Sequence, residues 1–135
     1  MARRAITILL CILMLIPVVE AADLNAAEEQ ILAQFIASEA ENAPYAVHLA
    51  MAAALLNRLA DNRYPNTVSG ILSTAGYRAA RRTPAYESAL SAVRTAAAGM
   101  DLTGGATVWA RANTEKAAAI RVTFSAAGWV FGTEG

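Results

Sequence analysis

A glutamate, Glu39, shares the apolar face of a predicted helix. Leu32, Phe35, Ile36 and Glu39 follow one another at i, i+3, i+4 and i+7, which is the spacing of a single helical face. A carboxylate on such a face is either buried or lines a cleft. Burial without a cationic partner disfavours the ionised form, so a buried Glu39 could donate a proton near neutral pH. The alternative is a structural glutamate that caps its helix or forms an ion pair at the helix end.

The sequence lacks the residues that other common kinds of catalytic site need. The single histidine, His48, lies within a predicted buried helix, and no serine stands in a nucleophile-elbow sequence, which argues against a hydrolytic triad. Histidines, cysteines and clustered carboxylates are too few for a metal site. Gly104 and Gly105 mark a turn and do not form a phosphate-binding loop. The sequence therefore predicts no metal and no cofactor, and leaves acid chemistry by Glu39.

Aromatic side chains could complement such an acid by stacking on a carbohydrate. The candidates are Tyr45, Tyr64, Tyr77, Trp109, Phe124, Trp129 and Phe131. Each is also a candidate for the core, because aromatic side chains dominate the cores of small domains. We expect four of them to bind substrate, namely Tyr64, Tyr77, Trp109 and Trp129.

Residues 1–21 have the pattern of a secretory signal peptide. Two arginines near the start precede an apolar run over residues 5–19, and the tripeptide VEA at 19–21 has small residues where signal peptidase requires them. The run is shorter than the roughly 20 residues of a membrane-spanning helix. The sequence thus predicts export to the periplasm, the cell wall or the exterior, with a mature domain of residues 22–135. The alternatives are an uncleaved anchor or the signal-arrest segment of some phage lysins.

The remaining composition is that of one small, nearly neutral domain. A chain of 135 residues can bury a modest core. Its one cysteine, Cys11, lies in the predicted signal peptide, so export does not serve disulfide formation. Beyond residue 21, nine basic side chains face ten acidic ones, a balance that argues against nucleic acid as the partner. A neutral or mixed-charge polymer such as cell-wall glycan fits this balance.

The first part of the mature chain is predicted to form two helices. Asn25 and Glu28 have the capping-box spacing, which predicts a helix over residues 26–40. Asn42 suits a left-handed position that ends this helix, and Pro44 suits the first turn of the next. That second helix, over residues 44–60, is apolar almost all round and should be central and buried.

Two further helices and three strands complete the prediction. Thr67 should cap a short helical turn, and Thr83 with Pro84 should begin a third main helix that ends near Gly99. Short stretches rich in valine, threonine and aromatic residues predict strands at 106–110, 120–125 and 128–131. Three main helices followed by a small three-stranded sheet indicate an α+β domain.

Four motifs of the chain resemble the spore cortex-lytic cell-wall hydrolases of the SleB type. Residues 39–44 align with that family's E-A-x-G-E-P, and residues 50–58 with its A-V-x-A-V-x-L-N-R. Residues 64–72 resemble its F-P-x-T-I segment, and residues 99–106 its G-x-D-P-T-x-G-A turn. The motifs occur in order along most of the mature chain, which makes the resemblance specific.

The resemblance implies a lysozyme-like domain that cleaves the glycan strands of peptidoglycan as a lytic transglycosylase. Glu39 matches the catalytic glutamate of the family. It would protonate the glycosidic oxygen and then help the C6 hydroxyl of muramic acid to attack the anomeric carbon. This mechanism needs one carboxylate, whereas ordinary glycosidases use two. We expect such a domain to act as a monomer.

Several polar positions of the family's cleft are changed in this chain. The altered residues are Asn42, Ala43, Val47, His48, Tyr77, Arg78, Trp109, Ala110, Arg111 and Trp129. Because polar groups that bind a ligand can be lost while a scaffold is kept, a second interpretation is a homologue that binds peptidoglycan without cutting it.

Asn57 and Arg58 match the family's asparagine-arginine pair and are expected to support the site. The interpretation that we favour is structural, with the amide of Asn57 holding the following loop and Arg58 pairing with an acid. Buried amides are usually retained for the hydrogen bonds that they satisfy.

Overall fold

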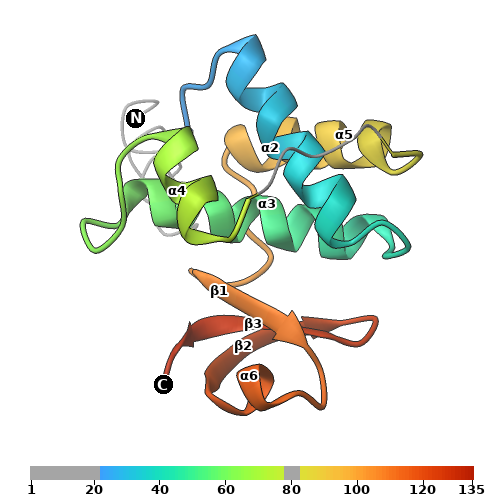
Figure 1. Ribbon diagram of the computed structural model, residues 1–135, viewed down its shortest axis with the longest axis vertical. Helices are drawn as coiled ribbons and strands as arrows, with labels where there is room; N and C mark the ends of the chain where they lie inside the picture. Colours follow the sequence, from blue (N-terminus) through green and yellow to red (C-terminus); the bar gives the residue numbers. More distant parts are fainter. Residues whose placement is uncertain (1–21, 78–82) are drawn as a thin grey trace, which may run out of the picture.

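The computed structural model describes residues 22–77 and 83–135, which form a helical part and a sheet (Figure 1). The helical part consists of α2 (Ala26–Glu39), α3 (Tyr45–Ala60), α4 (Val68–Thr74) and α5 (Tyr86–Ala97). The other part consists of β1 (Val108–Arg111), the short helix α6 (Glu115–Ala118), β2 (Ile120–Ala126) and β3 (Trp129–Glu134). The predicted α+β class, with the sheet after the helices, is confirmed.

The predicted signal peptide, residues 1–21, lies outside the described residues. Within the described ranges, no helix combines the length and the apolar character that a membrane crossing needs.

Helix α2 begins where the sequence predicts it. The side chain of Asn25 accepts a hydrogen bond from the backbone N–H of Glu28, and the Glu28 carboxylate accepts one from the N–H of Asn25. The C-cap after the helix is Ala40, whose φ of −131° is not left-handed. The prediction of a left-handed backbone conformation at Asn42 is wrong, since among the described non-glycine residues only Asn113 and Ala127 have a positive φ.

Helix α3 is the central helix, as predicted. Every residue from Val47 to Leu55 is buried, and so is Arg58 in its last turn. Pro44 precedes the helix as its N-cap and does not belong to its first turn. Helices α2 and α3 both pack against α5, and the core continues into the sheet through Trp109 and Phe131.

Helix α4 is capped by Thr67 as expected, whereas the start of α5 differs from the prediction. Thr67 accepts a hydrogen bond from the N–H of Gly70. The hydroxyl of Thr83 instead donates to the carbonyl oxygen of Ala37 in α2, and α5 begins only at Tyr86. Thr83 therefore links two helices, because a tertiary acceptor is within its reach.

The sheet is antiparallel, with the strand order β1-β3-β2 and β3 in the centre. Trp109 pairs with Phe131, and Arg111 pairs with Trp129. Strands β2 and β3 are joined at Ala127 and Gly128, which both have a positive φ, as a type I′ hairpin turn requires. This turn fixes Trp129 at the start of the central strand.

A close approach of the backbone makes Gly132 necessary in β3. It lies where the β2–β3 register shifts between Val122 and Phe124. A Cβ atom at this position would collide with the carbonyl group of Arg121. Any larger residue would force the two strands apart.

Candidate active site

A cleft of about 300 Å³ lies where the end of α2 faces the sheet. It is lined by Glu39, Trp109, Ala110, Arg111, Thr114, Lys116 and Trp129. These residues come from the C-terminal end of α2, from β1, from the segment that leads through α6, and from the start of β3. Among the described residues that line it, Glu39 is the single carboxylate.

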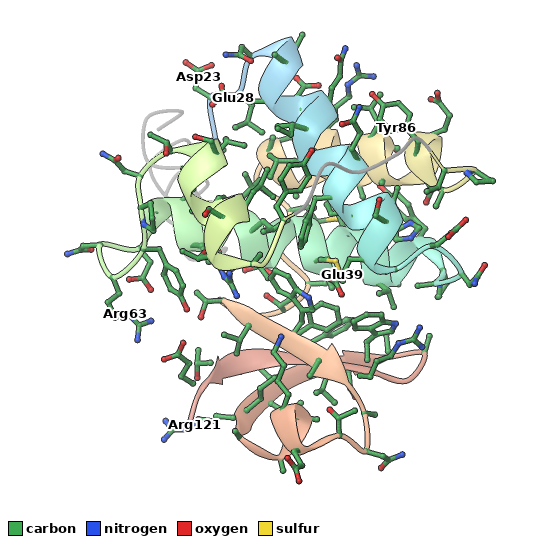
Figure 2. All side chains as sticks on the ribbon, viewed as in Figure 1. Asp23, Glu28, Glu39, Arg63, Tyr86 and Arg121 are labelled. Atoms are coloured by element: carbon green, nitrogen blue, oxygen red, sulfur yellow. The ribbon has the colours of Figure 1, made fainter. Side chains whose placement is uncertain are left out.

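Glu39 is the last residue of α2 and is exposed. The sequence left two positions open for Glu39, burial in the core or the lining of a cleft. Burial is wrong, and Glu39 lines a cleft. Leu32, Phe35 and Ile36 of the same helical face are buried in the core, but Glu39 lies beyond them, where the helix reaches the sheet. Figure 2 shows Glu39 at this junction of the two parts.

The buried His48 fixes the end of the helix that carries Glu39. Its Nε2 lies 2.7 Å from the carbonyl oxygen of Ala40, and its Nδ1 lies 2.8 Å from the hydroxyl of Ser88 in α5. Because a carbonyl oxygen can only accept, the proton of this hydrogen bond must be on Nε2. His48 thus connects α3 and α5 to the residue that directly follows Glu39.

Trp109 and Trp129 line the cleft together with Glu39, but both rings are mostly packed into the core. Trp109 is 3% exposed and Trp129 is 4% exposed. The ring of Trp109 also meets the ring of Phe35 edge-on at 6.1 Å between centres. Only a small part of either indole can therefore contact a ligand, so neither is an open stacking surface for a sugar.

Two cations accompany these tryptophans in the cleft. The guanidinium carbon of Arg111 lies 4.6 Å from the centre of the Trp129 ring, and Nζ of Lys116 lies 5.9 Å from that of Trp109. Both distances are within the range of cation–π attraction. Arg111 and Lys116 are exposed, and neither makes an ion pair within the ranges that the structure describes.

Asn57 lies in a separate network that joins α3 to the turn before β1, so the expectation that its amide holds the loop after α3 is wrong. Its Nδ2 donates to Oδ2 of Asp101 at 3.0 Å and to the carbonyl oxygen of Ala106 at 2.9 Å. Asp101 also accepts hydrogen bonds from the N–H and hydroxyl of Thr103 and from the N–H of Gly105. We call Asn57, Asp101, Thr103 and these backbone groups the Asn57–Asp101 network.

The carboxyl group of Asp101 is held in its ionised form by this network. Partial burial by itself would raise its pKa, but the hydrogen bonds from Thr103, Asn57 and Gly105 outweigh burial and lower the pKa of Asp101 below its ordinary value.

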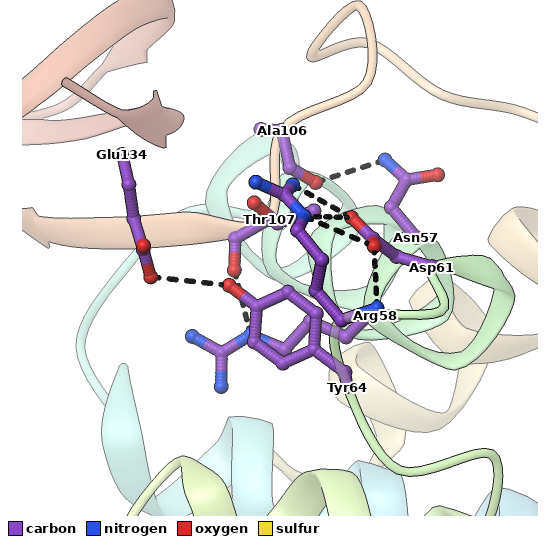
Figure 3. Close-up of polar contacts among 8 residues, drawn as sticks. Asn57, Arg58, Asp61, Tyr64, Ala106, Thr107 and Glu134 are labelled. Atoms are coloured by element: carbon purple, nitrogen blue, oxygen red, sulfur yellow. Dashed lines mark hydrogen bonds and ion pairs between the residues drawn. The ribbon is translucent and has the colours of Figure 1, made fainter.

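Arg58 is buried beside the network and does not pair with an acid, contrary to expectation (Figure 3). Its Nε donates to the carbonyl oxygen of Thr107, and its Nη1 lies 3.3 Å from the hydroxyl of Thr74. The guanidinium carbon lies 4.7 Å from the ring centre of Trp109 and 5.1 Å from that of Tyr64. Burial lowers the pKa of Arg58, while Tyr64 and Glu134 act in the opposite direction. Arg58 thus supports the wall of the cleft from behind Trp109.

Tyr64 and Tyr77 are not among the described residues that line the cleft with Glu39. The hydroxyl of Tyr64 lies 3.4 Å from Oε1 of Glu134, and the residue lines another surface hollow with Asp61 and Pro65. Tyr77 packs beside Phe35, with ring centres 6.2 Å apart. The structure therefore brings together Glu39, Trp109 and Trp129 but separates the two tyrosines from them.

The sequence prediction named Arg111 only as a changed position of the family's cleft, and it did not include Thr114 and Lys116. The hydroxyl of Thr114 donates to the carbonyl oxygen of Arg111 and accepts from the N–H of Ala117, so it shapes the turn after β1 and caps α6. Helix α6 was also not predicted, since four residues carry too weak a periodic signal. Thr114 at a capping position was the one local sign of it.

The chain is similar in structure to two solved catalytic domains. It shares 28% identity and a TM-score of 0.67 with the catalytic domain of the Bacillus cereus SleB protein, over 81% of this chain and 91% of that one. It shares 26% identity and a TM-score of 0.64 with the catalytic domain of the germination-specific lytic transglycosylase SleB from Bacillus anthracis, over 80% and 95% respectively. No protein-family model matches the sequence, and no curated protein matches it either. The fold is that of the SleB catalytic domain, as the sequence motifs predicted.

Proposed function

We propose that this chain, whose fold is that of the SleB catalytic domain, cleaves the glycan strands of peptidoglycan. The observation that carries the proposal is the position of Glu39, the single acid among the described residues of a cleft walled by Trp109 and Trp129. The similar domain from Bacillus anthracis is a lytic transglycosylase, which supports the same reaction class here.

The reaction that suits a single carboxylate is a transglycosylation within the substrate. The carboxylic acid of Glu39 gives its proton to the glycosidic oxygen, and the bond from that oxygen to the anomeric carbon of muramic acid breaks. The C6 hydroxyl of the same sugar then attacks the anomeric carbon, and the Glu39 carboxylate takes the hydroxyl proton. The products are a 1,6-anhydro end and a free hydroxyl on the departing sugar, and Glu39 is again protonated.

This scheme agrees with the absence of a second carboxylate from the described lining of the cleft. Inverting and retaining glycosidases place two carboxyl groups across the scissile bond, one of them to activate water or to form a covalent intermediate. The internal C6 hydroxyl makes both of those roles unnecessary.

The test is incubation of residues 22–135 with purified peptidoglycan, with Glu39→Gln in parallel and products identified by mass spectrometry. Anhydro-ended fragments from the wild type alone would support the proposal. Fragments with reducing ends would indicate hydrolysis by water and replace the transglycosylase mechanism.

A second candidate function is binding to peptidoglycan without cleavage. The near-complete burial of Trp109 and Trp129 favours it, because little aromatic surface is available to hold a sugar ring in a reactive position. Sedimentation of the folded domain with the wall, with no fragments released over long incubation, would establish this function and exclude the first.

Export is part of the proposal, because peptidoglycan lies outside the cytoplasmic membrane. It depends on the signal-peptide pattern of residues 1–21. N-terminal sequencing of the secreted protein should begin at Ala22. An intact N-terminus retained in the membrane fraction would instead indicate an anchor of the kind that phage lysins use.

A further inference from the structure

We propose that the cleft selects a glycan that carries a carboxylate next to the scissile bond, and that Arg111 and Lys116 bind this carboxylate. The inference rests on the proposed function, because it names the substrate class of the same cleft. It begins from two positive charges that form no ion pair and no side-chain hydrogen bond within the described residues.

The cations of the helical part that the structure describes have partners. Arg63 pairs with Asp61 at 2.7 Å, Arg94 pairs with Glu29 at 2.8 Å, and the buried Arg58 donates to the carbonyl oxygen of Thr107. In contrast, the side chains of Arg111 and Lys116 form neither an ion pair nor a hydrogen bond within the described ranges. Two unpaired cations in one cleft create a local positive potential that favours an anionic ligand.

The tryptophans hold these two cations in place without using their hydrogen-bond donors. Arg111 lies over the ring of Trp129, and Lys116 lies near that of Trp109. A cation–π contact takes up none of the N–H donors, so those of the guanidinium group and of the ammonium group stay available. Because Trp109 and Trp129 are buried, the surfaces on which the cations rest are rigid. A cation that is positioned in advance loses less entropy when it binds an anion.

The role of Glu39 in the proposed reaction requires a neutral oxygen beside it. Its carboxyl group lines the same cleft and gives its proton to the glycosidic oxygen, so the carboxylate of the substrate must lie against other residues. A substrate that suits these lining residues presents a neutral glycosidic oxygen to Glu39 and a carboxylate to Arg111 and Lys116.

Peptidoglycan supplies a carboxylate on the muramic acid at the scissile bond in two ways. The lactyl group of muramic acid is a free carboxylate where the stem peptide has been removed. Where the stem peptide is present, the lactyl group is an amide and the peptide's own carboxylates carry the charge. Both sources share the chemistry of a carboxylate attached to muramic acid.

The test compares four soluble glycans by isothermal titration calorimetry. They are peptide-free strands, strands with stem peptides, and both materials after their carboxyl groups have been converted to methylamides. The proteins are residues 22–135 as wild type, as the double variant Arg111→Gln/Lys116→Gln, and as Arg121→Gln. Arg121 is a matched control, because it is an exposed cation on β2 that lies away from Glu39 in Figure 2 and does not line the cleft.

We expect the double variant to bind a carboxylate-bearing glycan on the order of tenfold more weakly than the wild type, with Arg121→Gln unchanged. Amidation of that glycan should weaken wild-type binding to the same extent and make it insensitive to the double substitution. The peptide-free or the peptide-bearing strand that shows this pattern identifies the source of the carboxylate.

The inference is overturned if neither strand loses affinity on amidation, or if the double variant binds all four glycans as the wild type does. Cleavage assays with the same materials keep the two proposals separate. Carboxylate-dependent binding without any cleavage would refute the enzyme and keep the selectivity. Equal cleavage of native and amidated strands would keep the enzyme and refute the selectivity.

Discussion

Two polar regions lie between the helices and the sheet, the Asn57–Asp101 network and the cleft with Glu39. They differ in whether their side chains form hydrogen bonds and ion pairs within the protein. In the Asn57–Asp101 network, Asn57 donates two hydrogen bonds, and Asp101 accepts from Asn57, Thr103 and Gly105. In the cleft, the charged groups of Glu39, Arg111 and Lys116 have no hydrogen bond or ion pair within the ranges that the structure describes. All three are exposed.

This difference distinguishes polar side chains that stabilise the fold from polar side chains that are free to bind a ligand. A partly buried polar group whose hydrogen bonds are satisfied inside the protein stabilises the fold and has little left for a ligand. Exposed charges that converge on a cleft stabilise the fold little, and they keep their full capacity for binding. Substitutions in the network should therefore alter stability, and substitutions in the cleft should alter activity.

The largest effect is expected from Glu39→Gln. Removal of the proton donor should lower the rate of glycan cleavage about 10²- to 10⁴-fold. The melting temperature should stay within about 2 °C of the wild type, because an exposed residue without internal partners contributes little to the fold. The measurements are fragment release by mass spectrometry and thermal unfolding by circular dichroism. A large loss of stability with the activity per folded molecule retained would reverse the assignment of Glu39.

Arg58→Ala should have the largest effect on stability. It leaves the carbonyl oxygen of Thr107 without its partner and removes the cation beside Trp109 and Tyr64. We expect the free energy of unfolding in urea to fall by about 2–4 kcal/mol. Arg121→Ala, at an exposed position, is the control and should change it by less than about 0.5 kcal/mol. Equal stability of the two variants would contradict the structural role of Arg58.

Asn57→Ala should have a smaller effect than Arg58→Ala. The substitution removes two hydrogen bonds and leaves Asp101 and the carbonyl oxygen of Ala106 with fewer donors. The expected loss in the free energy of unfolding is about 1–3 kcal/mol. Asn66→Ala, in an exposed loop, is the matched control and should be nearly neutral. Should Asn57→Ala abolish glycan cleavage in molecules that remain folded, the separation of the two regions would fail.

The smallest effect is expected on the stability of the fold at low pH, through the carboxyl group of Asp101. The pKa of Asp101 is lower in the folded protein than its ordinary value, because hydrogen bonds from Thr103, Asn57 and Gly105 outweigh burial, which alone would raise it. Stability from a lowered carboxyl pKa is complete above the unfolded value of about 4 and is lost as the pH falls through the folded value. Since Asp101 is only partly buried, its contribution should be below about 1 kcal/mol.

Urea unfolding of the wild type and Asp101→Asn between pH 7 and pH 2.5 checks this expectation. The wild type should be the more stable protein at pH 7, and the difference should shrink below about pH 4. Two curves that stay parallel over the whole range would show that Asp101 does not act through its charge.

Local features of the fold were predictable because their hydrogen bonds join neighbours in the sequence. The capping box of Asn25 and Glu28 and the cap at Thr67 each connect residues three apart, and both are present. The start of α5 was predicted wrongly, because Thr83 meets the carbonyl oxygen of Ala37 from a distant part of the chain. No local pattern contains that contact.

The candidate site was predictable in part. Helical spacing and the SleB-type motifs pointed to Glu39, and the structure places it in a cleft with Trp109 and Trp129. Arg111 was named only as a changed position of the family's cleft, and Lys116 was missed, since a single cation in a helix of four residues has no periodic signal. Tyr64 and Tyr77 were expected with Glu39, although their aromatic character alone could not distinguish packing from substrate binding.

Side-chain periodicity and short motifs are enough to predict the α+β class, the central apolar helix and Glu39 as the candidate acid. The exposure of Glu39 and the presence of Arg111 and Lys116 in its cleft follow from the folding of the whole chain. These features depend on it because the cleft forms between the end of α2 and a sheet that begins about 70 residues later. Packing of helices on strands sets which of these distant side chains are covered and which stay free to bind.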